Sequence, residues 1–379
     1  MLVISLMLFP AERSFFSYVD ISFMQSAEIS DEFFFSGGDV KGLISLLYDF
    51  DEKRSAYLSY SIGYDGPGNY IADKDIKERS ILNSLFAEYH YMWKSNLRIR
   101  PSIYFNVEKF KDNALSNYND NIYNNAVSGI GMSLDLIKKE YYLTFISGYR
   151  KIHYPNYTDL ISEIKYDSNF TKTGMYDKDV YEIGFRLKKE IWFSDLSYKR
   201  YVYARQRTIK PDGTVSGPRQ RDSDFTIVVG QNRRVGFFNF YPSLSLSIYS
   251  SNQNYLRYRD LFDTSPFFVE DAYSRKDFEI GIPLSVDLEH ASLNLTAVLS
   301  SRFYSSRPPR DKNNNYLVGK KQHQYIYRFC ADYTIRITDL TYWKIGYALH
   351  ISKSNNRFET YIPYNYTAHS FYLGYGIRY

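Results

Sequence analysis

The sequence has little of what holds most secreted or helical membrane proteins together. Its 379 residues include a single cysteine, Cys330, which excludes a disulfide framework and a zinc site built from cysteines. No uninterrupted apolar run reaches about 18 residues, so membrane-spanning helices are excluded. Helical periodicity is nearly absent, because its best example, residues 159–164, is too short to fold as a helix alone.

Neither sign of charge dominates the sequence. The 47 Lys and Arg and 42 Asp and Glu residues give a net charge of +5, with no basic block or nucleic-acid-binding motif, so we expect no nucleic-acid partner. The length would allow two or three domains, yet no Pro-, Gly- or Ser-rich linker and no shift in composition divides the chain. We therefore expect one domain over residues 15–379, with residues 1–14 as a short lead.

Aromatic residues are abundant, and they follow a period of two. The 40 Tyr and 27 Phe favour strands, in contrast to only 3 Trp. Apolar and polar residues alternate most clearly in residues 278–286, 293–303, 325–335, 343–351 and 371–379. Several of these stretches span about 10 residues or more, the length that a tilted strand needs to cross a bilayer. Counting such stretches along the chain gives about 16 strands (14–18).

The connections between these strands alternate in length. Short polar turns are expected at residues 51–54, 94–96, 138–140, 188–190, 231–234, 288–290 and 338–341. Between them lie long polar loops, including residues 153–178, 205–222, 250–273, 305–322 and 353–367. Short turns at one rim and long loops at the other are typical of an all-β, up-and-down antiparallel transmembrane β-barrel.

The charged residues indicate which face of each strand meets lipid. The strand faces rich in Leu, Ile, Phe and Tyr carry almost no charge, whereas the opposite faces carry residues such as Arg98, Asp135 and Arg186. A lipid-facing Lys or Arg costs roughly 2 to 4 kcal/mol at the bilayer midplane, so the charged faces are expected to line a wet lumen. Soluble sandwiches or a propeller would also give alternation, but they require linkers, shorter strands or a blade motif, and none of these is found.

Two residue types test the barrel hypothesis further. Trp93, Trp192, Trp343 and Tyr379 all fall next to short turns or at the terminus, where they predict an aromatic girdle at one membrane interface. Chance clustering of so few Trp residues remains an alternative.

Three prolines interrupt strand-like stretches. Because proline has no N–H to donate to the ladder, bulges or strand ends are expected at Pro101, Pro242 and Pro283.

The last nine residues carry a family resemblance. The alternation of Phe371, Leu373, Tyr375 and Ile377, ending on Tyr379, resembles the terminal signal strand of bacterial outer-membrane β-barrel proteins. The resemblance implies a porin-like architecture located in the bacterial outer membrane, with no specific subfamily. It also implies two partners, the outer-membrane lipid and the barrel-assembly machinery, which reads this C-terminal strand.

The first residues of the chain allow two interpretations. Residues 1–10, MLVISLMLFP, resemble the end of the apolar region of a signal peptide, although no Lys or Arg precedes them. Residues 1–14 are therefore interpreted either as a truncated signal segment or as part of an ordinary strand.

No motif for catalysis or cofactor binding is present. The sequence contains no phosphate-binding glycine loop, no Gly-x-Ser-x-Gly elbow and no His-Glu-x-x-His motif, so we expect neither an enzyme nor a cofactor nor a metal. Glu88 and His90 share a lumen-facing side, but nothing in their spacing distinguishes a metal site from ordinary polar residues. Outer-membrane enzymes exist, so this expectation rests only on the missing motifs.

One group of lumen-facing residues suggests selectivity. On the last strands the basic residues outnumber Asp332, the one acidic residue on the same faces; this group, the basic stave, comprises Arg302, Arg328, Arg336, Lys344 and Arg378. Such a row would concentrate anions in a narrow pore, unless acidic loop residues fold inward and neutralise it.

These observations predict a passive channel for small hydrophilic solutes, with a weak anion preference. A barrel of about 16 strands is wide enough for an aqueous lumen. The candidate constriction is the loop of residues 250–273, whose side chains of interest are Tyr255, Arg257, Tyr258, Arg259 and Phe262. The alternative is a non-channel barrel that exports or displays proteins, or that adheres through its long Tyr-rich loops.

Overall fold

The structure is a computed structural model of the whole chain. It describes residues 15–30, 34–67, 79–111, 118–119, 121–157, 174–257, 266–358 and 364–379. The segment 1–14, interpreted above as a signal or lead, and the weak helical pattern at 159–164 lie outside the described residues.

The described residues form twenty strands in chain order. Their bounds are β1 Phe15–Ser30, β2 Phe34–Asp51, β3 Arg54–Pro67, β4 Arg79–Lys94, β5 Leu97–Lys111, β6 Asn125–Ile137, β7 Tyr141–His153, β8 Lys178–Lys189, β9 Trp192–Arg207, β10 Arg219–Gln231, β11 Arg233–Val235, β12 Phe238–Phe240, β13 Ser243–Ser251, β14 Tyr255–Arg257, β15 Phe267–Val269, β16 Arg275–Asp287, β17 Ala291–Tyr304, β18 His323–Arg336, β19 Thr341–Ser354 and β20 Tyr366–Arg378. Within the described part of the chain, no helix is long and apolar enough to cross a bilayer.

Eighteen of these strands join one antiparallel sheet that closes on itself. β11 continues β10, and β12 leads into β13, because their pairings keep one register across a short interruption. The sheet is therefore a closed barrel of 16 spans, as the alternation predicted. The closure is made by β1 and β20, whose register runs from Asp20 opposite Arg378 to Ser30 opposite Ala368.

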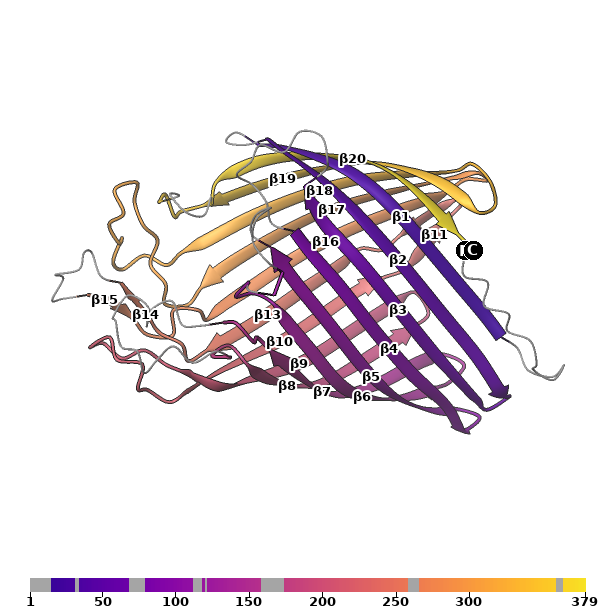
Figure 1. The fold of residues 1–379 in the computed structure, drawn as a ribbon, viewed down its shortest axis with the longest axis horizontal. Coiled ribbons are helices and arrows are strands. Elements are labelled where there is room, and N and C mark those ends of the chain that lie inside the picture. The colour runs from indigo at the N-terminus through magenta and orange to yellow at the C-terminus, as the bar shows by residue number, and fades with distance from the viewer. Residues whose placement is uncertain are drawn as a thin grey trace.

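The two ends of the barrel differ in the length of the connections between strands (Figure 1). The strands are tilted, and tight hairpins such as Glu52–Lys53 join them at one end. The longer connections, including β14 and β15, gather at the other end. We call these the short-turn end and the loop end; in outer-membrane barrels the short turns face the periplasm.

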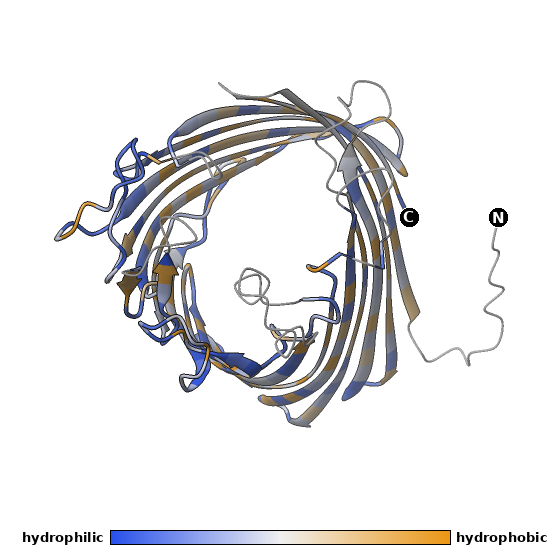
Figure 2. Ribbon diagram, turned by 60° about the vertical axis from the view of Figure 1, so that its left-hand side comes forward, coloured by the Kyte–Doolittle hydropathy of each residue, from blue (hydrophilic) through white to orange (hydrophobic). Residues whose placement is uncertain are grey.

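The outward face of the barrel is apolar. Ile103, Ile130 and Ile183 point outward at mid-strand, with 56%, 64% and 54% of their surface exposed. Hydropathy alternates along the strands when the barrel is viewed toward its end (Figure 2). Exposed Ile and Leu side chains in such number would be unstable in water, and in a bilayer they lie in the solvent that they prefer.

The three prolines are accommodated in a way that differs in part from the prediction. Pro242 lies in the interruption between β12 and β13, so the expectation of a strand end is confirmed there. Pro101 and Pro283 lie inside β5 and β16, where the expected bulges are wrong. The register stays the same on both sides of each proline. The strand pairs next to Pro101 toward β4, and those next to Pro283 toward β12 and β13, are missing. The proline nitrogen has no proton to donate, so the ladder is interrupted there, although the Pro283 carbonyl oxygen still accepts a hydrogen bond from the Tyr241 N–H at 2.9 Å.

One predicted turn is also wrong. The hairpin expected at residues 231–234 is displaced, because the strand resumes as β11 and turns only at Gly236 and Phe237. Asn232 interrupts the strand there and donates its backbone N–H to the carbonyl oxygen of Ile191 at 2.6 Å. The polar run resembled a turn, yet it is a local break within a longer hairpin.

Candidate functional site

The inner wall of the barrel is lined by polar and ionised side chains from alternate strand positions. On β18 the inward residues include Arg328, Cys330 and Asp332, while the outward neighbours include Tyr327 and Phe329. The inward ions are wet: the side chains of Arg328 and Glu279 are 47% and 42% exposed. An interior that leaves facing ions this accessible contains water.

The basic stave lies on the inner wall, but most of its charges are paired. Arg302 donates to Asp277 at 2.9 Å, and Arg328 donates to Glu279 at 2.8 Å. Lys344 lies 3.7 Å from Asp332. These acids sit on β16 and β18, so the expectation of a stave facing only Asp332 is wrong, because barrel closure and register bring acids of neighbouring strands to the same wall.

Arg378, another residue of the basic stave, forms an ion pair with Asp20 where β1 and β20 close the barrel. The Arg378 guanidinium donates to Asp20 at 3.0 Å, across the β1–β20 seam, and Tyr342 donates its hydroxyl to the same carboxylate at 2.9 Å. Among the described residues, Arg336 has no carboxylate within ion-pair distance and is the stave residue left without one.

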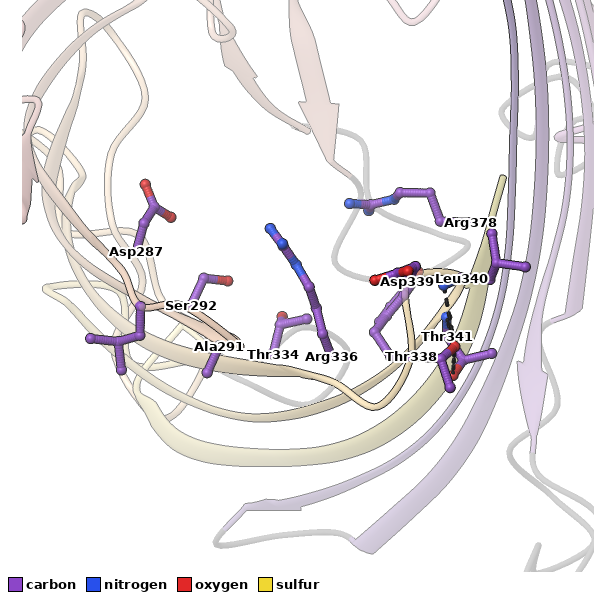
Figure 3. A pocket seen from close by; sticks show the side chains of 12 residues that line it. Asp287, Ala291, Ser292, Thr334, Arg336, Thr338, Asp339, Leu340, Thr341 and Arg378 are labelled. Carbon is purple, nitrogen blue, oxygen red and sulfur yellow. Dashed lines mark hydrogen bonds between the residues drawn. The ribbon is translucent and has the colours of Figure 1, made fainter.

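Arg336 contributes to a pocket at the short-turn end of the lumen. The pocket has a volume of about 290 Å³ and is lined by side chains from the β16–β17 and β18–β19 hairpins and from β20. In Figure 3 the guanidinium groups of Arg336 and Arg378 extend into the same space, with Asp287 and Ser292 on its far side. The pocket therefore combines two cations, the two acids Asp287 and Asp339, and several hydroxyl groups at the short-turn end of the barrel.

A second charged group lies on the opposite part of the wall, near the same end. Asp135 on β6 has a side chain with no exposed surface, and it accepts hydrogen bonds from Arg98 at 2.8 Å and from Arg100 at 2.7 Å. Arg100 also donates to Glu88 at 3.0 Å, and Glu88 lies 2.6 Å from His90. The sequence placed these residues on the lumen face but gave no sign that they converge.

The carboxylate of Glu88 is shared between His90 and Arg100. Glu88 and His90 do share the inner face, as the alternation predicted, and Arg100 bonds to Glu88 from the next strand. A guanidinium on the carboxylate competes with any cation. Across the residues that the structure describes, no cluster of three or more His, Cys, Asp or Glu side chains is placed to hold a metal ion.

Loops narrow the lumen at the loop end beside β8, β9 and β10. Tyr203 and Asp222 point inward from the wall, yet only 2% of the surface of each is exposed. Tyr203 and Tyr249 both donate their hydroxyl groups to Asp222, at 2.9 and 2.7 Å. Inward residues in a wet lumen are buried only where other parts of the chain cover them. Gln253, from the loop after β13, extends the network by donating to Gln220 at 2.9 Å.

Lys178 anchors the β7–β8 loop in the same region. Its ammonium nitrogen lies 4.2 Å from the ring centre of Tyr176 and 5.5 Å from that of Tyr154, both loop residues. It also lies 5.2 Å from the ring centre of Tyr203 on the wall. Burial within this aromatic cluster raises the pKa of Tyr154 to about 12. A cation beside four aromatic rings, the fourth being Tyr201 at 5.9 Å, joins the loop to the barrel. This cluster could not be predicted from the sequence, because its members come from separate segments of the chain.

The candidate constriction loop is described only in part. Tyr258, Arg259 and Phe262 lie outside the described residues. Tyr255 and Arg257 belong to β14, which pairs with β15 beyond the loop-side ends of the barrel strands (Figure 1).

This described part of the loop packs against its neighbour. Arg257 donates to the backbone and side-chain oxygens of Asn314 in the β17–β18 loop, and Phe267 stacks on Tyr316 with ring centres 3.9 Å apart. Aromatic stacking and hydrogen bonds therefore hold β14 and β15 on the next loop; that Tyr255 and Arg257 help to narrow the lumen stays a prediction.

The aromatic residues predicted for the girdle lie at the short-turn end. Trp93, Trp192 and Trp343 point outward with 60%, 54% and 41% of their surface exposed, and Tyr379 follows β20 at the same end. The structure thus brings all four to one rim; that they mark a membrane interface stays a prediction.

Comparison with known proteins gives a fold and no closer relationship. No protein-family model and no curated protein sequence matches the chain. Among solved structures, OmpT of Vibrio cholerae folded in vitro, an outer membrane protein, is similar over 98% of this chain and 99% of its own, with 7% identity and a TM-score of 0.50. OpdO of Pseudomonas aeruginosa is similar over 96% and 97%, with 10% identity and a TM-score of 0.47. The siderophore receptor PirA of the same organism matches 96% of this chain and 80% of its own, with 8% identity and a TM-score of 0.41.

At these identities the likeness concerns architecture alone. Together with the closed barrel and its apolar exterior, it establishes that the chain has the fold of bacterial outer-membrane β-barrels. The predicted resemblance to this class is confirmed, and no subfamily is indicated.

Proposed function

We propose that the protein is a passive channel for small hydrophilic solutes, without enzymatic activity. The observation that carries the proposal is the solvent exposure of ionised side chains on the inner wall. Arg328 at mid-barrel and Arg186 nearer the short-turn end are about half exposed although they point inward, at 47% and 54%. A plugged interior would bury them.

The narrowed loop end and the paired ions shape what this channel would pass. Loops cover the wall around Asp222, so the loop end is tighter than the middle on that side. Ion pairs such as Arg302–Asp277 leave the wall almost neutral, while Arg336 keeps an uncompensated charge at the short-turn mouth. We therefore propose a weak anion preference that depends on Arg336 more than on the rest of the basic stave.

Planar-bilayer recording tests the channel. Purified protein is expected to give steady open conductance steps, and in a salt gradient the reversal potential is expected to indicate a small preference for chloride. Arg336→Gln should move the reversal potential toward zero, because it removes the unpaired inward charge. Arg200→Gln, which removes the same charge from the outer surface, is the matched control and should leave it unchanged.

Two outcomes would contradict the proposal in distinguishable ways. A cation preference in the unmodified protein would end the anion preference while leaving the channel intact. Complete electrical silence would contradict the channel itself and favour the alternative, a barrel for surface binding or export. That alternative is supported by the exposed loop tyrosine Tyr123, which is 51% exposed and packs on Tyr157.

A further inference from the structure

The outer surface of the β9–β10 hairpin carries arginines where its apolar band ends. Arg200 shares the outward face of β9 with Leu196 and Tyr198, and Arg221 shares that of β10 with Ile227. The register sets Arg200 opposite Ser223 and Arg221 opposite Val202, so the two arginines are diagonal neighbours. Diagonal neighbours on a sheet lie about 7 to 8 Å apart, within reach of long side chains.

The height of these arginines can be estimated from the girdle residue on the same strand. Arg200 follows Trp192 by eight positions, or about 26 Å along a strand, which a tilt of about 40° reduces to about 20 Å of height. Arg221 lies level with Val202, two positions higher, or about 25 Å above Trp192. The apolar band of such barrels is about 25 Å tall, so both guanidinium groups reach the headgroups of the outer leaflet.

The pairing of charges differs between the two faces of these same strands. Inward Arg186 donates to Asp195 at 2.7 Å, and inward Lys199 lies 3.8 Å from Glu182. Outward Arg200 and Arg221 are both exposed, and neither has a carboxylate within ion-pair distance among the described residues. The inner wall neutralises its cations within the protein, and this part of the outer wall does not.

The nearest outward acid does not neutralise the arginines. Asp179 on β8 lies opposite Val202, diagonal to Arg200, but outside ion-pair distance of it. Asp179 instead accepts a hydrogen bond from the Tyr149 hydroxyl at 2.7 Å, and Lys151 lies directly opposite it on β7. The local balance on this face therefore stays positive.

The end of the same hairpin adds two further arginines. Arg207 and Arg219 occupy directly opposite positions on β9 and β10, and both are exposed. Arg207 donates to the carbonyl oxygen of Gly217 at 3.2 Å. Arg207 lies seven positions beyond Arg200, past the register shift between Arg219 and Arg221, so this pair lies farther toward the loops than Arg200 and Arg221 do.

We propose that this hairpin surface, with Arg200 and Arg221 at its centre, binds the phosphate groups of a phosphorylated lipid in the outer leaflet. Guanidinium groups bind phosphate oxygens through two parallel hydrogen bonds, and the apolar band below holds the acyl chains. The partner is a lipid because Leu196, Tyr198 and Ile227 lie directly beneath the arginines on the same face.

Native mass spectrometry of the full chain in detergent tests this proposal, with lipid A as the probe. Lipid A carries two phosphate groups, and the same lipid with its phosphates removed serves as the matched ligand. The unmodified protein is expected to bind the phosphorylated lipid about ten-fold more tightly than the dephosphorylated one. The double variant Arg200→Gln/Arg221→Gln should lose most of this difference.

Controls keep the outcome interpretable. Arg186→Gln removes an inward arginine from the neighbouring strand and should bind lipid as the unmodified protein does. The single variant Arg221→Gln, at the rim, provides a milder test if the double variant does not fold. Unchanged lipid affinity in folded Arg200 and Arg221 variants would overturn the proposal. So would equal competition by inorganic phosphate at the same concentration, since the surface would then be a site for free anions.

Discussion

At the scale of single residues, the inner wall depends on charges that satisfy one another. Asp135 is the clearest example, because its buried carboxylate accepts hydrogen bonds from two arginines and from the Thr144 hydroxyl, the latter at 2.9 Å. The carboxylate is what allows Arg98 and Arg100 to lie side by side. Without it, two partly buried guanidinium groups would repel each other with no carboxylate between them.

Asp135→Asn is therefore expected to destabilise the barrel by about 2 to 4 kcal/mol, since it leaves two cations without their shared partner. Urea unfolding in lipid vesicles, followed by tryptophan fluorescence, measures the change. Asp195→Asn is the matched control: its ion pair with Arg186 is exposed to water, and a loss below about 1 kcal/mol is expected. Equal losses in the two variants would show that burial of Asp135 is not what matters.

At the scale of strands, β19 and β20 pack through pairs of opposite glycine and tyrosine residues. Tyr342 on β19 lies directly opposite Gly376 on β20, and Tyr372 lies opposite Gly346. A Cβ atom on Gly376 would lie 2.2 Å from the Tyr342 ring, and one on Gly346 would lie 2.0 Å from the Tyr372 ring. Each ring covers a glycine of the neighbouring strand, an arrangement that stabilises glycine within sheets.

Gly376→Ala is expected to cost about 1 to 3 kcal/mol, because the added methyl group displaces the Tyr342 ring that bonds to Asp20 at the seam. The same unfolding measurement applies. Gly63→Ala is the control on an inward position of β3, where the new Cβ would meet only ordinary contact, 3.7 Å from Leu82. It should be neutral or stabilise the strand by about 0.5 kcal/mol. A neutral Gly376→Ala would mean that the ring moves freely.

The same scale shows what could be predicted from the sequence. Alternation with a period of two is a local property, so it gave the spans, their faces and the inward position of Arg302 and Arg378. Register is not local: Asp20 and Arg378 meet only because the barrel closes, although they are separated by nearly the whole chain. The pairing of Arg378 with Asp20 was therefore missed, as was the cluster around Lys178.

Local exceptions to the ladder also escaped prediction. The polar residues around Asn232 look like a turn in sequence, yet the hairpin extends past them. Interrupted ladder pairs stand beside Pro101 and Pro283 where bulges were expected, because the proline nitrogen has no proton to donate. Such choices depend on the whole sheet.

At the scale of the whole molecule, the outer and inner faces of the barrel are expected to contact different solvents. The outward side chains contact lipid, and the inward side chains contact water. Cys330 and Phe329 test this at one height of β18, because they are adjacent and point to opposite sides of the wall. The natural cysteine is the only one in the chain, so no other thiol interferes.

A nitroxide spin label attached to Cys330, or to Phe329→Cys in a Cys330→Ser background, reports its surroundings by collision with dissolved relaxation agents. In lipid vesicles the label at position 330 is expected to respond mainly to a water-soluble nickel complex, and the label at 329 mainly to oxygen, which concentrates in the bilayer. The reverse pattern, or equal access of the nickel complex to both positions, would contradict a barrel with a lipid-facing exterior and a wet lumen.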